Sequence, residues 1–129
     1  MTTDLWMVVW SAVLALLFFN TYATALYAIS GGLGWGFGNR DQPLELPPWA
    51  ARARRAHANL VENLAPFAVL VLVAHVTGKA NATTALGAQI FFWGRIAHAA
   101  LYITGIRYAR TAAFTVALVG EILILFQLF

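Results

Sequence analysis

Two groups of polar residues interrupt the apolar stretches of this sequence. In each group the members recur every three or four residues, which places them on one face of a helix. The first group is Arg52, Arg55, Asn59 and Glu62, and the second is Arg95, His98 and Tyr102. Charged side chains inside a membrane span are costly, and they are usually paired or functional. Because arginine forks bind carboxylate and phosphate groups, the pattern predicts either an anion-binding site or structural ion pairs.

The depth of these residues predicts which of them meet. The helix of the first group would enter the membrane on the side where the helix of the second group leaves it. At a rise of about 1.5 Å per residue, Glu62 and Arg95 both lie about 15 Å from that side. We therefore expect these two residues to meet, and for this pair alone we favour a structural ion pair over chemistry. Closer to the surface, we expect a cluster of the remaining polar residues and two later arginines, namely Arg55, Asn59, His98, Tyr102, Arg107 and Arg110.

Other charged residues have simpler interpretations. Arg52, Arg54 and Arg107 are candidate interfacial anchors for lipid phosphate, and for Arg54 we favour that interpretation. Glu121 stands within the last apolar stretch. It either pairs with an arginine of its own or of a neighbouring subunit, or it changes its protonation state, and both alternatives stay open.

The composition is typical of a membrane protein. Of the 129 residues, 61% are hydrophobic and only 10% are charged, and the mean hydropathy is +0.74. A soluble domain has about 25% charged residues, and a soluble fold this small would not bury so much apolar surface. The length leaves no room for a second domain, so we expect one domain over residues 1–129. The net charge of +3 comes from a few arginines beside apolar spans, so nucleic acid is not an expected partner.

The sequence contains no cysteine. This excludes disulfides, thiolate metal sites and a cysteine nucleophile, and we expect no metal site. Any thiol chemistry would need a thiol supplied by a ligand.

Four helices are expected to position the polar groups. No charged residue occurs from Leu5 to Asn39, and about 20 apolar residues are enough to cross the hydrocarbon core. Glycines and prolines then predict a loop up to Pro48, and Gly78 and Gly105 mark two further breaks. The expected fold is an all-α integral membrane protein, a four-transmembrane-helix bundle with helices at about 5–30, 49–77, 82–103 and 110–129.

The distribution of basic residues predicts the orientation. The first and third connections are rich in arginine, whereas the second carries only Lys79. Cytoplasmic loops of membrane proteins have an excess of lysine and arginine. We therefore expect a multi-pass protein of the cell membrane, with the first and third connections in the cytoplasm and both termini outside.

The polar groups also carry a family resemblance. Residues 55–62 read R-A-H-A-N-L-V-E and are followed by Pro66-Phe67, which resembles the R-A-H-x-N-x-x-E…P-F signature of the MAPEG superfamily (membrane-associated proteins in eicosanoid and glutathione metabolism). Residues 94–102 read G-R-I-A-H-A-A-L-Y and resemble the G-R-x-x-H-x-x-x-Y element of that family. Arg110-Thr111 resembles the R-[S/T] pair that opens the fourth helix. The resemblance covers the chain from about Trp49 to its end.

This resemblance implies a homotrimer of four-helix subunits with active sites between neighbours. Enzymes of the family bind glutathione there as a thiol co-substrate, and conjugate it, reduce lipid hydroperoxides or isomerise lipids. Carried over by position, the residues in or beside the glutathione site would be Arg55, Asn59, Glu62, Arg95, His98 and Tyr102. Arg110 would lower the pKa of the thiol, with Thr111 as a hydrogen-bond donor, since the thiolate is the nucleophile. A lipophilic substrate would arrive laterally from the membrane lipid.

Three departures from the family pattern keep a second function open. Ala58 stands where several glutathione-using members have arginine, Phe114 stands where some have tyrosine, and the first helix has no basic residue. A site with fewer cations would bind glutathione more weakly. The alternative to a glutathione-dependent transferase or peroxidase is therefore a non-catalytic protein of the same fold, whose basic rim binds an anionic lipid headgroup or a protein partner.

A third hypothesis is a b-type haem held by His57 and His98, which lie at similar depth. His57 is about 200° around its helix from Arg55, so it is expected to point away from the polar face. We do not favour the haem hypothesis for this reason.

Overall fold

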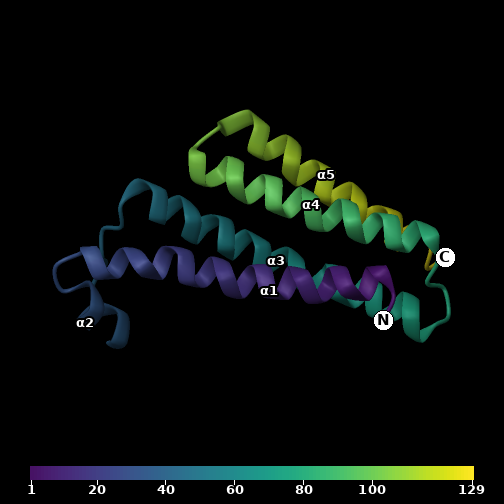
Figure 1. Ribbon diagram of the computed structural model, residues 1–129, viewed down its shortest axis with the longest axis horizontal. Helices are drawn as coiled ribbons and strands as arrows, with labels where there is room; N and C mark the ends of the chain where they lie inside the picture. Colours follow the sequence, from purple (N-terminus) through teal and green to yellow (C-terminus); the bar gives the residue numbers. More distant parts are fainter.

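The computed structural model describes all residues 1–129 and contains helices but no strands (Figure 1). Two short elements, the 3-10 helix η1 (Thr24–Ala28) and α2 (Gly32–Phe37), follow the first long helix. The long helices are α1 (Thr3–Ala23), α3 (Pro48–Val76), α4 (Ala82–Thr104) and α5 (Arg107–Phe126). The all-helical class predicted from the sequence is therefore confirmed.

The region after α1 differs from the prediction. The sequence predicts one helix to about residue 30, but the α-helix ends at Ala23 and tightens into η1. The stretch predicted as a loop contains α2, which begins after Gly31 in the left-handed region (φ 72°), a conformation that glycine adopts at little cost. Behind α2 the chain folds back, because the indole Nε1 of Trp35 donates to the carbonyl oxygen of Gln42 over 2.5 Å. This folded connection lies beside the start of α3.

The ends of the later helices follow from their end residues. Pro48 occupies the first turn of α3, where proline fits because its missing N–H would have no partner in the helix. Asn81 caps α4 and forms a capping box with Thr84. Gly105 ends α4 in the left-handed region (φ 86°), and α5 begins two residues later. The fourth long helix thus starts three residues earlier than the sequence predicts, which brings Arg107 and Arg110 into its first turn.

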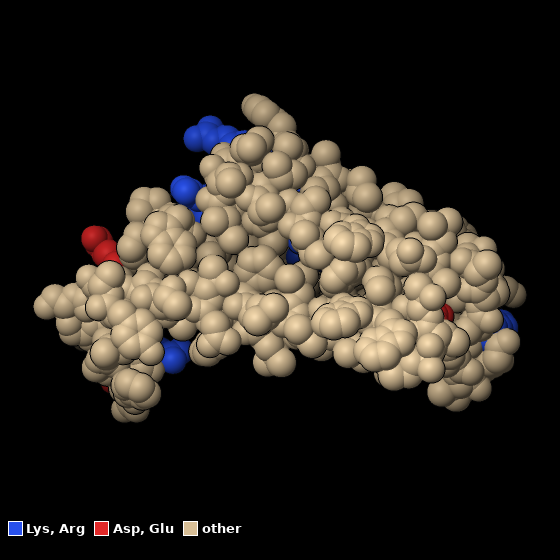
Figure 2. All heavy atoms as spheres, in the orientation of Figure 1, with Lys and Arg blue, Asp and Glu red and all other residues tan.

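Three helical segments are long and apolar enough to cross a membrane: Thr3–Ala28, Pro48–Val76 and Arg107–Phe126. Helix α4 has 23 residues and is not among these three segments; it carries Gln89, Arg95 and His98. On the face shown in Figure 2, most of the surface is uncharged and most of the charged side chains lie toward the two ends. These features agree with the membrane protein predicted from the composition.

Helices α4 and α5 make the closest helix pair, and α1 packs against α3 and α4. The two backbones of the α4–α5 pair approach at Gly87 and Gly120. A Cβ atom added to Gly120 would lie 2.5 Å from the carbonyl oxygen of Gly87, and one added to Gly87 would lie 2.6 Å from the carbonyl oxygen of Gly120. Small residues allow such close packing between membrane helices. The α4–α5 pair lies side by side along its length (Figure 1).

An aromatic contact joins α3 to this pair. The rings of Phe67 on α3 and Phe91 on α4 stack with their centroids 3.9 Å apart, and both side chains are buried. Ala117 and Ile124 of α5 belong to the same core. This packing fixes the polar face of α3 opposite those of α4 and α5.

A second polar contact lies at the other end of the bundle. Asp4 on α1 is only 2% exposed, and its Oδ2 accepts a hydrogen bond from the hydroxyl of Thr84 on α4 over 3.1 Å. The same oxygen lies 3.0 Å from Nε2 of His75 on α3. Asp4 therefore connects three helices at the end away from the arginines.

Candidate functional site

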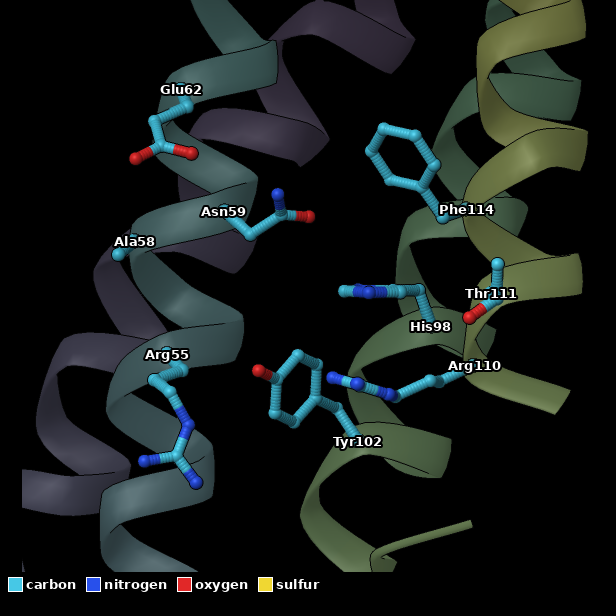
Figure 3. Close-up of a pocket in the computed structure, with 9 residues that line it drawn as sticks. All are labelled: Arg55, Ala58, Asn59, Glu62, His98, Tyr102, Arg110, Thr111 and Phe114. Carbon is cyan, nitrogen blue, oxygen red and sulfur yellow. The ribbon is translucent and has the colours of Figure 1, made fainter. Parts of the chain in front are cut away.

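A polar pocket of about 500 Å³ lies where α3 faces the pair of α4 and α5 (Figure 3). Helix α3 contributes four lining residues, α4 two and α5 three, each from the face predicted to be polar or from a position beside it. The pocket is lined by Arg55, Ala58, Asn59 and Glu62 on α3, with His98 and Tyr102 on α4 and Arg110, Thr111 and Phe114 on α5. The structure thus brings together seven of the eight residues assigned to the site from the sequence; the eighth, Arg95, is not among the lining residues.

Tyr102 stands between two arginines of this pocket. The guanidinium carbon of Arg110 lies 4.4 Å from the ring centroid of Tyr102, and that of Arg55 lies 6.0 Å from it. Both distances allow a cation–π attraction, which holds a guanidinium over an aromatic ring. Arg110 and Arg55 come from helices α5 and α3, so Tyr102 sets the spacing of two positive charges across the pocket.

Arg95 lies behind the pocket and supports one of its walls. Its side chain is 2% exposed, and its Nη2 donates to Oδ1 of Asn59 over 2.8 Å. The guanidinium also lies 5.7 Å from the ring centroid of Phe114. The ion pair that the sequence predicts between Glu62 and Arg95 is not formed, because Arg95 turns to the amide of Asn59, one helical turn closer to the arginine-rich end, while Glu62 is exposed in the pocket.

His98 forms the inner wall of the pocket. It is 5% exposed, and its ring lies edge-on to that of Tyr102 at 5.4 Å. The ring of Phe114 lies 6.1 Å away on the other side. His98 is therefore held between two aromatic rings on α4 and α5.

One acid and one hydroxyl of the pocket have no hydrogen-bond partner within the chain. Glu62 and Thr111 are both exposed, and the side chain of neither makes a hydrogen bond or ion pair within the chain. Glu62 is on α3 and Thr111 is on α5, on opposite sides of the pocket (Figure 3). Glu62 can therefore bind a positively charged group of a ligand, and the Thr111 hydroxyl can donate a hydrogen bond to an acceptor atom at the ligand's other end.

An adjoining pocket extends the positive charge toward the end of the bundle. It has a volume of about 370 Å³ and shares Arg55, Tyr102 and Arg110 with the first pocket, while Arg52, Gly105 and Arg107 complete its lining. Nε of Arg52 donates to the carbonyl oxygen of Ile103 over 2.7 Å, which joins α3 to the end of α4. From the sequence, Arg52 and Arg107 are candidate lipid anchors; the spacing of three residues between Arg52 and Arg55 is the signal that both line one cavity.

Two other residues singled out in the sequence lie outside the pocket. Glu121 on α5 is 7% exposed and forms no ion pair within 4 Å. His57 points toward α1, where its Nδ1 lies 3.3 Å from the hydroxyl of Tyr22. His57 and His98 do not line a common cavity, so the geometry does not support the pair of axial haem ligands.

The chain matches one protein family over almost its whole length. The model of the MAPEG family matches residues 3–129, which includes the first helix in addition to the residues from Trp49 on that carry the sequence resemblance. No curated protein matches the chain significantly. The match extends over both polar motifs and all four long helices. The chain therefore belongs to the MAPEG family.

Proposed function

We propose that this protein is a membrane-embedded glutathione-dependent transferase or peroxidase that acts on lipophilic electrophiles or hydroperoxides. The observation that carries the proposal is the placement of Arg55 and Arg110 on either side of Tyr102 in one pocket with Glu62. Glutathione carries two carboxylates, one ammonium group and one thiol. The pocket offers guanidinium groups for the carboxylates and a carboxylate for the ammonium group.

The volume of the pocket supports a ligand of this size. About 500 Å³ lies within the range of about 300–1,000 Å³ that small-molecule sites occupy. The adjoining pocket, with Arg52 and Arg107, adds further positive charge at the arginine-rich end of the bundle. A tripeptide whose ammonium group pairs with Glu62 would hold the carboxylate of the same carbon on the side of Arg55. Its glycine carboxylate would extend toward Arg52 and Arg107.

Arg110 and Thr111 are the groups proposed to act on the thiol. A positive charge beside a thiol stabilises the thiolate and lowers the thiol pKa, and the Thr111 hydroxyl would donate a hydrogen bond to the sulfur. In the transferase reaction the thiolate attacks an electrophilic carbon, a carbon–sulfur bond forms, and the leaving group departs with the bonding electrons. In the peroxidase reaction the thiolate attacks a hydroperoxide oxygen, a sulfur–oxygen bond forms, and the oxygen–oxygen bond breaks to release an alkoxide that takes up a proton to become the alcohol. A second glutathione then reduces the sulfenic acid, which gives glutathione disulfide and water.

The assembly and orientation belong to the same proposal. We propose that all four long helices cross the cell membrane, that three copies form a homotrimer, and that the arginine-rich end faces the cytoplasm with both termini outside. Packing of α4 against α1, α3 and α5 supports the fourth crossing, since its Arg95 and His98 are buried against protein rather than exposed to lipid. Six arginines, but no lysine, lie at the end with the first and third connections, and this excess supports the orientation: Arg40, Arg52, Arg54, Arg55, Arg107 and Arg110.

Titration of glutathione into the detergent-solubilised protein tests the proposal. We expect saturable binding, and a rise in thiolate ultraviolet absorbance that the Arg110→Ala variant loses. An Arg40→Ala variant serves as the control, because Arg40 lies in the connection before α3 and does not line this pocket. The absence of binding at millimolar glutathione, with no turnover of a model electrophile, would contradict the proposal.

A second candidate function rests on the four arginines of the adjoining pocket. Arg52, Arg55, Arg107 and Arg110 line it without an acidic residue, an arrangement that supports binding of an anionic headgroup by a non-catalytic protein. In that case glutathione would not bind, and the affinity for anionic lipid would fall in an Arg107→Gln variant.

A further inference from the structure

A third cavity lies on the opposite side of α3 from the glutathione pocket. It is enclosed by the end of α1, by η1, by α2 and its following loop, and by the start of α3. The residues that define it are Phe19, Tyr22, Leu26, Trp35, Arg40 and Arg54, and none of them lines either pocket described above. We call it the arginine–aromatic pocket.

Arg40 is held in place over this pocket by three features. Its Nη2 and Nε donate to the carbonyl oxygen of Gly36 over 3.0 and 3.4 Å, and its guanidinium carbon lies 5.3 Å from the centroid of the Trp35 ring. Its backbone has a φ of 61°, which is uncommon for a residue other than glycine. A side chain fixed in this way presents its remaining N–H groups at low entropic cost.

Arg54 supplies a second cation from α3. Its side chain is exposed and makes no hydrogen bond or ion pair within the chain. The acids of the neighbouring loop, Asp41 and Glu45, form no ion pair with Arg40 or Arg54, and neither acid lines the pocket. The pocket therefore carries two guanidinium groups and no carboxylate, which favours a ligand with net negative charge.

The remaining walls are apolar and lie at the edge of a membrane-crossing segment. Phe19, Tyr22 and Leu26 belong to the segment Thr3–Ala28, which is long and apolar enough to span a membrane. The Phe19 side chain is 47% exposed. Aromatic residues beside basic ones are typical of the membrane–water interface. The ligand should thus combine a negative headgroup with an apolar part.

The size of the pocket shows how much of such a ligand it would hold. Its volume is about 90 Å³, well below the range of about 300–1,000 Å³ for whole small molecules. One water occupies about 30 Å³ in the liquid, so the pocket has room for a tetrahedral phosphate but not for an entire amphiphile. The apolar chains would lie outside it, along α1 and in the bilayer.

We propose that the arginine–aromatic pocket binds the phosphate of an anionic phospholipid, with Arg40 and Arg54 as the two cationic ligands. The acyl chains pass over Phe19 and Leu26 into the membrane. The site is independent of glutathione, because it shares no residue with the glutathione pocket. The lipid ties the folded connection after α1 to the start of α3, the helix that also carries Arg55, Asn59 and Glu62.

Native mass spectrometry of the detergent-solubilised protein tests this site with two lipids of identical acyl chains, phosphatidylglycerol and phosphatidylcholine. We expect the wild type to bind phosphatidylglycerol more tightly. Each basic residue near an anionic headgroup contributes about a fivefold change in affinity. Arg54→Gln should therefore weaken phosphatidylglycerol binding about fivefold and the Arg40→Gln/Arg54→Gln variant about 25-fold, with phosphatidylcholine binding unchanged.

Two matched variants locate the effect. Lys79→Gln removes one positive charge in the second connection, outside all three pockets, and Arg54→Lys keeps the charge while it removes the planar fork. We expect Lys79→Gln to bind as the wild type does and Arg54→Lys to lie between the wild type and Arg54→Gln. An equal loss in Lys79→Gln and Arg54→Gln, or no loss in Arg54→Gln and in the double variant, would overturn the assignment. Gel filtration and helical circular dichroism identify any variant that has not folded, and Arg54→Lys then carries the test.

Sodium phosphate, added in place of lipid, distinguishes a free anion from a headgroup. We expect phosphatidylglycerol to raise the unfolding temperature of the wild type but not that of the double variant, and phosphate to raise neither. Stabilisation of the wild type by phosphate as large as that by phosphatidylglycerol would show that the pocket takes a free anion, and the lipid assignment would be wrong.

Discussion

Arg95 on α4 donates from its Nη2 to Oδ1 of Asn59 on α3 over 2.8 Å. Because Oδ1 is occupied by this bond, the amino group of the Asn59 side chain is left as the donor available to a ligand. Asn59 lines the polar pocket between α3, α4 and α5, and Arg95 does not. Arg95 is therefore a positioning residue, which acts on the pocket through the amide that it orients.

Loss of the Asn59 side chain should destabilise the protein. Asn59→Leu would leave a buried N–H group of Arg95 without its partner, which costs about 1–3 kcal/mol. We expect the midpoint of thermal unfolding in detergent to fall by several degrees. Asn63→Leu is the control, because the Asn63 amide bonds only to the backbone carbonyl of Asn59 in its own helix, over 2.7 Å. An equal fall in both variants would show that the contact between α3 and α4 contributes nothing.

The close approach of α4 and α5 should not tolerate a methyl group at Gly120. An added Cβ would lie 2.5 Å from the carbonyl oxygen of Gly87 and 2.7 Å from the backbone nitrogen of Phe91, and overpacking of this kind typically costs about 1–3 kcal/mol. We expect Gly120→Ala to lower the unfolding temperature. Gly34→Ala meets nothing within 4 Å, and alanine is the better helix former, so that variant should be unchanged or more stable. If Gly120→Ala unfolded at the same temperature as the wild type, α4 and α5 would be able to move apart at little cost, which would contradict the prediction.

An arginine at position 58 should strengthen glutathione binding. Ala58 lines the pocket together with Arg55 and Glu62 and is exposed, so a longer side chain has room there. One more ion pair at a partly exposed site contributes up to about 1 kcal/mol, which corresponds to a Kd about fivefold lower. Titration calorimetry of Ala58→Arg measures this change. Ala58→Gln adds length without charge and should leave the Kd near that of the wild type; an equal gain in both would rule out the electrostatic explanation.

The natural absence of cysteine allows the orientation to be measured with single-cysteine variants. Asp41→Cys places a thiol in the first connection and Ala80→Cys places one in the second. With a membrane-impermeant maleimide on intact cells, we expect Ala80→Cys to react at once and Asp41→Cys to react only after the cells are permeabilised. The reverse pattern would show that the arginine-rich end faces outward, against the positive-inside rule.

The membrane class, the family and most of the pocket can be predicted from the amino-acid sequence alone. An apolar helix of about 20 residues is recognisable without tertiary information, because its length is set by the bilayer. Residues three or four apart share a helical face in any fold, so the spacing alone groups Arg55, Asn59 and Glu62. The same rule grouped His98 with Tyr102.

Which of these helix faces pack together, and in which register along the helix axes, depends on the tertiary structure. Helical depth predicts Glu62 at the level of Arg95. However, the long arginine side chain reaches about one turn along the neighbouring helix. The packing of Phe67 on Phe91 fixes the register of α3 and α4 in which Arg95 meets Asn59 instead of Glu62. The end of α1 at Ala23 and the fold of the following connection were equally beyond the sequence pattern. They depend on contacts between residues distant in the chain, and these contacts create the arginine–aromatic pocket from Phe19, Trp35, Arg40 and Arg54.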